Sequence, residues 1–218
     1  MIKKVLLIVL LSLSAVSLFS ADLDTDLKTG EGTWKITSTS ITQTDIEAPR
    51  AKIAVPYSQE GTEITYEFYV QYQGGALEDG HGGFGVHIFA DEIVQGPAWG
   101  AGKSLLIWLN YDENPRDVTK GLSAQVYQSK THSTMVLLED IDLNWIIDEL
   151  ASADYTIEDV FADPIKIKII VNTSTRKLKI ADPVQEDVYY EIDLPGSVPL
   201  KGSYIVFRTN GMSASFSR

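Results

Sequence analysis

The segment from Thr62 to Gln73 alternates between apolar and polar side chains at nearly every position. One set consists of Ile64, Tyr66, Phe68, Val70 and Tyr72, and the other of Thr65, Glu67, Tyr69 and Gln71. Successive side chains of an extended strand point to opposite faces, so this pattern predicts a long strand with one face on an apolar core. A chain built around such a strand is constrained to form a sheet.

Shorter runs of the same kind recur along the rest of the chain. They are Phe84 to Phe89, Leu105 to Tyr111, Leu122 to Ser129, Thr134 to Leu138, Ile165 to Val171, Lys177 to Ile180, Val188 to Leu194, Tyr204 to Arg208 and Met212 to Phe216, with weaker candidates near Trp34, Ile41 and Ile53. The pair Asn210-Gly211 predicts a type I′ hairpin, because it accepts positive φ angles. Short strands separated by turns predict an all-β, antiparallel two-sheet sandwich.

One segment has helical spacing instead. Leu143, Ile146, Ile147 and Leu150 fall at i, i+3, i+4 and i+7, and Asp142 is placed to cap the start. We expect a short helix over residues 143–151. A capping box from Thr156 to Asp159 predicts a second helical turn in the same connection between strands.

The first 21 residues have the three parts of a secretory signal peptide. Two lysines precede an apolar stretch from Val5 to Phe19, and cleavage is expected after Ser20 or Ala21. An uncleaved anchor is the alternative, but the stretch is shorter than the roughly 20 apolar residues that a membrane span requires. We expect residues 1–21 to direct export to the periplasm or cell surface, and residues 22–218 to form one β-sandwich domain without a membrane span.

Composition restricts the partners of this domain. The formal net charge is -12, and nucleic acid is therefore not an expected partner, because phosphate binding needs clustered lysine and arginine. The chain has no cysteine, so an apolar core must stabilise the exported protein without disulfides. Carbohydrate or another envelope protein remains as the expected partner, and the oligomeric state is open.

Several patterns along the chain resemble the concanavalin A-like, or laminin-G-like, jelly-roll domain. They are an early Gly-Thr-Trp ending at Trp34, the long aromatic-rich strand, a Gly-Phe-Gly strand around Phe84 and a closing Asn-Gly-Met at Met212. The resemblance covers nearly the whole chain after the leader. It implies a jelly-roll sandwich, in a group that includes lectins, glycoside hydrolases and protein-binding modules.

Catalytic signatures are weak. The family-16 glycoside hydrolases of this group have Glu-x-Asp-x-x-Glu on one strand, whereas the nearest stretch here, from Glu139 to Asn144, departs from it and fits a solvated acidic loop. Gly80, Gly82 and Gly85 match a dinucleotide fingerprint, but a strand follows where a helix is required. We expect a glycine-rich approach to a strand.

An acidic turn offers oxygen atoms at alternate positions. Asp112, Asn114 and Asp117 are candidates for a structural calcium ion. An EF-hand loop, however, needs glycine where Pro115 stands and glutamate where Gly121 stands. Polar turn residues that stabilise the backbone are the alternative interpretation. The three histidines lack zinc spacing, and we assign no catalytic metal or other cofactor.

Aromatic and amide side chains recur on the expected non-core sides of the strands. Flat rings beside amides suit a sugar, which presents apolar CH faces and many hydroxyl groups. Cross-strand aromatic pairs that stabilise the sheet are the alternative. The candidate ligand-binding residues are Tyr69, Gln71, His87, Trp99, Trp108, Asn110, Gln125 and Tyr127, with Glu67 and Phe89 beside them.

Three functions remain for this exported sandwich. The first is a non-catalytic module that binds carbohydrate or another envelope ligand. The second is a structural or assembly role in the envelope or on a surface filament, for example as a component of a periplasmic flagellar sheath. The third is a glycoside hydrolase, for which Glu67 or Glu139 would be needed.

Overall fold

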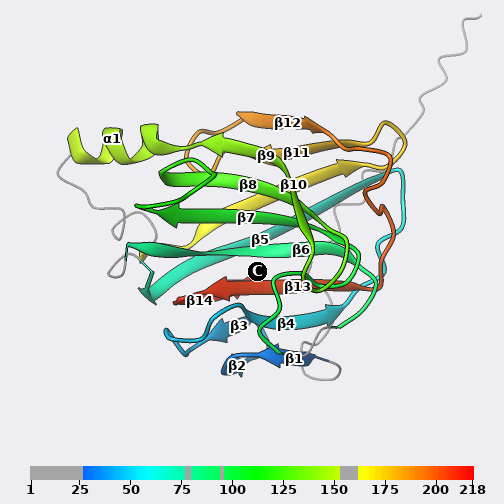
Figure 1. Ribbon diagram of the computed structural model, residues 1–218, viewed down its shortest axis with the longest axis horizontal. Helices are drawn as coiled ribbons and strands as arrows, with labels where there is room; N and C mark the ends of the chain where they lie inside the picture. Colours follow the sequence, from blue (N-terminus) through cyan, green and yellow to red (C-terminus); the bar gives the residue numbers. More distant parts are fainter. Residues whose placement is uncertain (1–26, 77–79, 94–95, 153–161) are drawn as a thin grey trace, which may run out of the picture.

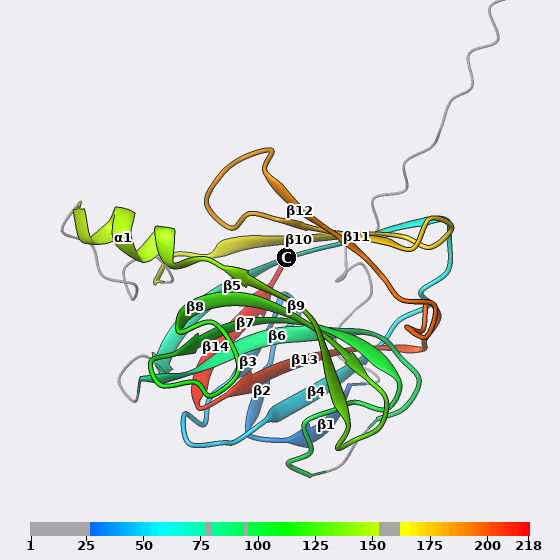
Figure 2. The ribbon, with the colours of Figure 1, turned by 45° about the horizontal axis from the view of Figure 1, so that its top comes forward.

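The computed structural model describes residues 27–76, 80–93, 96–152 and 162–218. The expected signal peptide and the expected helical turn at 156–159 lie outside these residues. Within them, the chain forms two sheets of seven strands, stacked as two layers (Figures 1 and 2). In spatial order the first sheet contains β1 (Lys28–Glu31), β4 (Ala51–Pro56), β13 (Tyr204–Asn210), β6 (His81–Ala90), β7 (Ser104–Asp112), β8 (Gly121–Ser129) and β9 (Met135–Asp142).

The second sheet is built from segments at both ends and the middle of the chain. Its order is β12 (Tyr189–Asp193), β11 (Lys177–Ala181), β10 (Ile165–Asn172), β5 (Glu63–Gly75), β14 (Met212–Ser217), β3 (Ser40–Gln43) and β2 (Trp34–Ile36). Neighbouring strands of both sheets pair antiparallel. The predicted antiparallel two-sheet sandwich is confirmed.

The core lies between the layers, where the alternating residues place it. Ile64, Tyr66, Phe68 and Val70 of β5 are all buried, as the period of two predicts. Phe216 of the second sheet meets Phe207 of the first with 4.8 Å between ring centroids. Aromatic contacts of this kind join the two layers.

The predicted helix is present as α1, Asn144–Ser152. Asp142 caps it, since its Oδ1 accepts a hydrogen bond of 2.8 Å from the backbone N–H of Asn144. Leu143 and Ile146 are buried against β8, which docks the start of the helix at one end of the sandwich (Figure 2). In the described part of the chain, no helix has the length and hydropathy that crossing a bilayer would need.

Two local predictions are wrong. Asn210-Gly211 does not close a hairpin, because β13 belongs to the first sheet and β14 to the second. Only Gly211 has a positive φ, of 59°, whereas a type I′ turn needs two such residues, so the pair turns the chain from one layer to the other. The acidic stretch from Glu139 to Asp142 is not a loop but the second half of edge strand β9, paired with β8.

Phe89 also differs from its expected place on the outer face. Its φ of 57° accompanies a register shift between β6 and β13, and the extra residue turns the ring inward, edge-on to Tyr66 at 6.3 Å. The buried Gln59 supports this bulge, accepting a 2.7 Å hydrogen bond from the Phe89 N–H.

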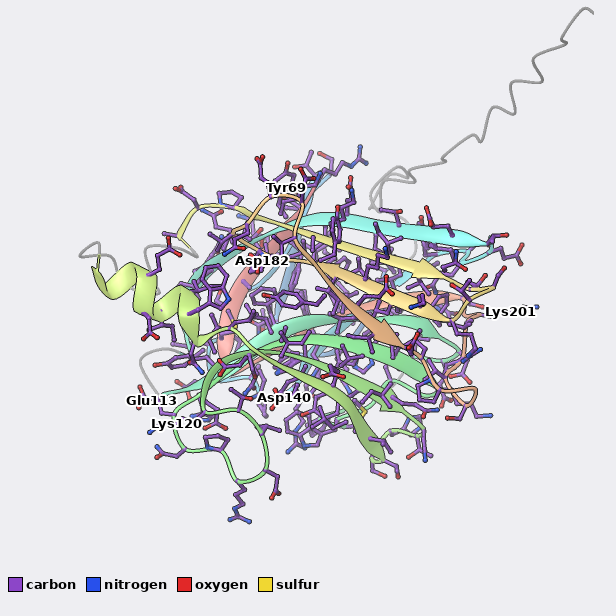
Figure 3. The ribbon with its side chains drawn as sticks, turned by 90° about the horizontal axis from the view of Figure 1, so that it is seen from above. Tyr69, Glu113, Lys120, Asp140, Asp182 and Lys201 are labelled. Carbon is purple, nitrogen blue, oxygen red and sulfur yellow. The ribbon has the colours of Figure 1, made fainter. Side chains whose placement is uncertain are left out.

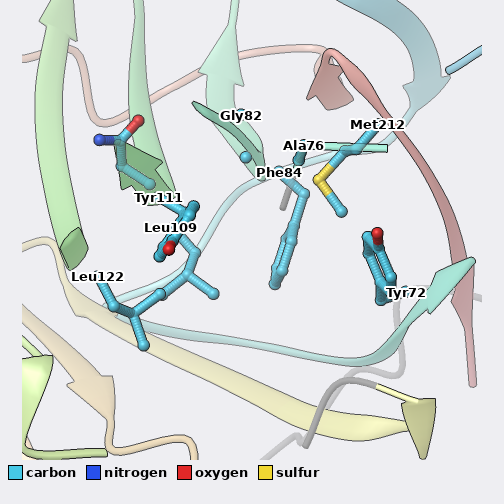
Figure 4. Close-up of a pocket in the computed structure, with 10 residues that line it drawn as sticks. Tyr72, Ala76, Gly82, Phe84, Leu109, Tyr111, Leu122 and Met212 are labelled. Carbon is cyan, nitrogen blue, oxygen red and sulfur yellow. The ribbon is translucent and has the colours of Figure 1, made fainter. Parts of the chain in front are cut away.

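A small apolar cavity lies between the layers (Figure 4). Tyr72, Phe84, Leu109 and Met212 are among the side chains around it, and its volume is about 30 Å³. That volume suits about one water molecule and is too small for an organic ligand.

Candidate functional site

The outer face of the first sheet carries a groove with a volume of about 480 Å³. We call this side of the sheet the groove face. Its volume is within the range of small-molecule sites, and both aromatic and polar side chains converge on it. The lining residues are His81, Gly82, Trp99, Leu106, Trp108, Asn110, Asp112, Val118, Gln125, Tyr127, Ser133, Met135 and Asn210.

Strand register explains why these residues meet. Residues paired across antiparallel strands share a face, so a single row crosses the whole sheet. The row runs from Glu31 on β1 through Lys52, Arg208, Gly85, Trp108 and Gln125 to Asp140 on β9. Trp108 therefore stands next to the central strand, with the cationic pair and Glu31 on one side and Gln125 and Asp140 on the other.

Two glycines of β6 make room for Trp108. A Cβ on Gly83 would lie 2.7 Å from Trp108 Cζ2, and a Cβ on Gly85 would lie 3.0 Å from Trp108 Cε3. The indole therefore covers the bare backbone of β6. Because Gly85 has no side chain, Arg208 reaches across it, and its Cζ is 5.1 Å from the Trp108 ring centroid.

The polar groups of the groove are oriented by one another. Trp108 Nε1 donates to Asn110 Oδ1 at 3.1 Å, and the Tyr127 hydroxyl donates to Gln125 Oε1 at 2.8 Å. Gln125 Nε2 in turn donates to Ser123 Oγ at 3.1 Å. Burial raises the pKa of Tyr127, and the Asp140 carboxylate adds to this, so the phenol keeps its proton and remains a donor.

Five of the candidate binding residues come together in this groove: Trp99, Trp108, Asn110, Gln125 and Tyr127. Trp99 is the most exposed of the aromatic ones, at 44%, and it lies in the loop between β6 and β7. Alternation within β7 and β8 placed the other four on the groove face, although Trp108 and Gln125 are only 4% and 2% exposed. Trp99 lies outside the strands, so alternation does not apply to it, and its place in the site was predicted only from its position in a loop.

Tyr69 and Gln71 do not belong to the groove. They are on β5, in the second sheet, and Tyr69 lies on the opposite side of the molecule from Asp140 (Figure 3). Gln71 Nε2 donates to the Ala162 carbonyl at 2.8 Å. Glu67 is on the same outer face and pairs with Lys166 and Lys168 at 3.4 and 3.5 Å. Alternation predicts which face of a strand a side chain occupies, but it does not predict the sheet to which the strand belongs.

His87 points to the groove face yet is fully buried. Its Nδ1 is 2.9 Å from Ser104 Oγ, and burial lowers its pKa well below the usual value, with Arg208 and Lys52 adding to the effect. The ring is therefore neutral and does not line the groove. Sequence reasoning missed Lys52 and Arg208. The available signal was a charged residue in a strand segment, with Ala51 and Ile53 on either side of Lys52 and Phe207 before Arg208.

The acidic turn has the hydrogen bonding of an ordinary polar turn. Asp112 Oδ1 accepts the backbone N–H of Asn114 at 2.9 Å, which is the turn-stabilising role, while Asn114 and Asp117 are exposed. Across the described ranges, no group of three or more histidine, aspartate or glutamate side chains could hold a metal ion.

The sequence matches no protein-family model and no curated protein. Solved structures match the fold, including a legume lectin-like domain from Entamoeba histolytica, with a TM-score of 0.52, 13% identity, and 88% of this chain and 86% of that chain covered. A Bacillus subtilis protein of unknown function with a galectin-like fold gives 0.54 at 14% identity, covering 88% and 86%. The Ca2+/Man-bound form of the VIP36 exoplasmic/lumenal domain gives 0.52 at 14% identity, covering 87% and 82%. The fold is thus a lectin-like jelly roll, which confirms the concanavalin A-like resemblance.

Proposed function

We infer that this chain is a carbohydrate-binding module that takes a saccharide in the groove of the first sheet. The observation that carries this proposal is the groove itself, of about 480 Å³, where the exposed Trp99 and the partly exposed Tyr127 and Asn110 lie above the buried Trp108 and Gln125. Indole faces match the CH faces of a pyranose ring, and amides donate to and accept from its hydroxyl groups. The Ca2+/Man-bound VIP36 domain supports the choice of ligand class at the level of fold.

A catalytic role has less support. Hydrolysis of a glycosidic bond generally uses two carboxyl groups on either side of the bond. Among the described residues, Asp112 is the one carboxylate that lines the groove. Glu67 and Glu139, the earlier candidates, lie on different sheets and cannot act as a pair.

A glycan array followed by affinity measurements tests the proposal. Trp99→Ala removes an exposed indole from the groove, and Tyr189→Ala is a matched control, since Tyr189 is an exposed aromatic on β12 in the other sheet. We expect Trp99→Ala to weaken binding of the best glycan about threefold to tenfold, as loss of one aromatic contact does, and Tyr189→Ala to leave it unchanged. Absence of any glycan ligand, or equal losses in both variants, would refute the proposal.

Export belongs to the same proposal. Residues 1–21 have the composition of a signal peptide, and a module exported by them would meet saccharides outside the cytoplasm. Mass spectrometry of the protein isolated from its native cells is expected to show a chain that begins at Ala21 or Asp22. A chain that retains Met1 would contradict cleavage and favour the uncleaved anchor, without affecting the groove.

Assembly with another copy or an envelope protein is the second candidate function. Edge strand β9 favours it, because Val136 and Leu137 are exposed at 36% and 37% on the last strand of the described sheet. Exposed edges of this kind can pair with other chains. Light scattering on the purified protein tests it, and a monomer at high concentration would count against self-assembly.

A further inference from the structure

Three cationic side chains surround the loop that carries Trp99. Arg50 Nη1 donates to the carbonyl of Pro97 at 2.8 Å. Lys52 Nζ donates to Ala98 and Gly100, and Arg208 Nη1 donates to Trp99 itself. Each backbone carbonyl from residue 97 to residue 100 therefore accepts a hydrogen bond from a cation. We call these three side chains the clamp.

Two side chains of the clamp, Lys52 and Arg208, are costly to bury, which indicates that they have a purpose besides stability. Lys52 and Arg208 are 1% and 0% exposed, and neither forms an ion pair with the described carboxylates. Arg208 Nε and Nη2 have no hydrogen-bond partner in the described structure. Apolar side chains of similar size are generally as stabilising as buried charges or more so, whereas charges can define one specific arrangement.

The same arginine sets the relation between the two groove tryptophans. Arg208 Cζ lies 4.5 Å from the Trp99 ring centroid and 5.1 Å from the Trp108 ring centroid. Arg50 Cζ also lies 4.8 Å from the Trp99 ring centroid. A planar guanidinium stacks well on indole rings, so Arg208 links the loop tryptophan to the strand tryptophan.

We propose that Arg208, Lys52 and Arg50 are positioning residues that hold Trp99 as a preformed aromatic wall of the groove. They act on affinity through Trp99, because a wall that is already ordered loses little conformational freedom when the ligand arrives. The purpose of this wall rests on the proposed saccharide groove. The position of Trp99, however, can be measured with no ligand present, so the two proposals can fail independently.

The test uses the mature chain labelled with 5-fluorotryptophan and observed by fluorine NMR. The chain has four tryptophans, and the signal that disappears in Trp99→Phe identifies Trp99. In Arg208→Met and Lys52→Met we expect the Trp99 signal to narrow and its H₂O-to-D₂O shift to grow. The signals of Trp34 and Trp145 are expected to stay in place and thereby report an intact fold.

Arg176→Met is the matched control. Arg176 also holds a loop by its carbonyls, with bonds to Leu194, Pro195 and Val198, but that loop carries no tryptophan. We expect Arg176→Met to leave the Trp99 signal unchanged. Arg208→Lys should give an intermediate signal, because lysine keeps a donor but not the planar stacking surface.

An unchanged Trp99 signal in Arg208→Met, with Trp34 and Trp145 in place, overturns the proposal. Should Arg208→Met not fold, Arg50→Ala decides, because Arg50 is only half-buried and its loss still frees the Pro97 carbonyl. With the best glycan from the array as probe, Arg208→Met is expected to weaken binding about threefold to tenfold. If no glycan binds, the saccharide proposal fails while the fluorine signals still decide on the clamp.

Discussion

Lys52 shows how one buried side chain makes the stability of the whole protein depend on pH. Burial lowers its pKa from 10.5 to about 8, with the charges of Arg208 and Arg50 adding to the effect. The unfolded chain therefore holds more protons than the folded chain between about pH 8 and pH 10.5, and stability rises with pH in that window. Below about pH 8 both states are protonated, and the full cost of the buried charge is present.

We predict that the free energy of unfolding of the wild type rises by about 2 to 3 kcal/mol between about pH 7.5 and pH 10, relative to Lys52→Met. Urea unfolding of both proteins at the two pH values measures this difference. Lys201→Met is the control, since Lys201 is exposed. Parallel pH dependence of wild type and Lys52→Met would show that Lys52 carries no such penalty.

At the scale of single residues, the sequence predicted which face of a strand a side chain occupies better than it predicted how buried that side chain is. Alternation placed Trp108, Gln125 and Tyr127 correctly on an outer face. It could not show that His87 is fully buried beside Ser104, because burial on an outer face depends on tertiary contacts. Arg208 was missed because its hydrogen-bond acceptor is the Trp99 carbonyl in a distant loop, which no local pattern reveals.

Gln59 shows how one amide connects three strands. Its Oε1 accepts from the Tyr66 hydroxyl at 3.0 Å and from the Phe89 N–H at 2.7 Å, and its Nε2 donates to the Tyr204 carbonyl at 2.9 Å. These partners lie on β5, β6 and β13, so the amide joins both sheets at the β6 bulge.

We predict that Gln59→Met lowers the free energy of unfolding by about 2 to 5 kcal/mol, because it leaves several buried polar groups without partners. Gln73→Met on the exposed side of β5 is the matched control and should change stability little. Urea unfolding gives both values. A loss below about 1 kcal/mol for Gln59→Met would mean that water or local rearrangement replaces the amide.

At the scale of elements, most strands and α1 were predictable because each is a local pattern of two or 3.6 residues. The sheet to which each strand belongs was not predictable from such local patterns. Tyr69 was grouped with Trp108, yet β5 pairs with β10 and β14 in the second sheet. Asn210-Gly211 has the composition of a hairpin but connects the layers, because pairing is decided by distant strands.

The two outer faces of the molecule differ in character. On the second sheet, Lys177 and Lys179 pair with Glu191, and Lys168 pairs with Glu67, in ladders across neighbouring strands. Such exposed pairs contribute little stability and keep that face hydrated. On the first sheet, tryptophans and amides replace the ladders. This difference between the faces directs the expected ligand to the first sheet.

No disulfide joins the two layers, since the chain has no cysteine, and aromatic packing between them adds to the hydrogen bonds of Gln59. Phe216, two residues before Arg218 and fully buried, is the centre of the contact. Its ring centroid lies 4.8 Å from that of Phe207 in the first sheet, 6.4 Å from that of Phe84 and 6.3 Å from that of Phe68 in its own sheet. Removing it would open a cavity where both layers meet.

We predict that Phe216→Ala lowers the free energy of unfolding by about 3 to 5 kcal/mol, the range for a buried phenylalanine. That is a large part of the roughly 5 to 15 kcal/mol by which domains are stable, so the variant should unfold at much lower urea concentration. Tyr189→Ala removes a ring of similar size from an exposed site and should cost less than about 1 kcal/mol. Equal losses in the two variants would mean that the aromatic cluster does not join the layers, and that their cohesion comes from the aliphatic remainder of the core.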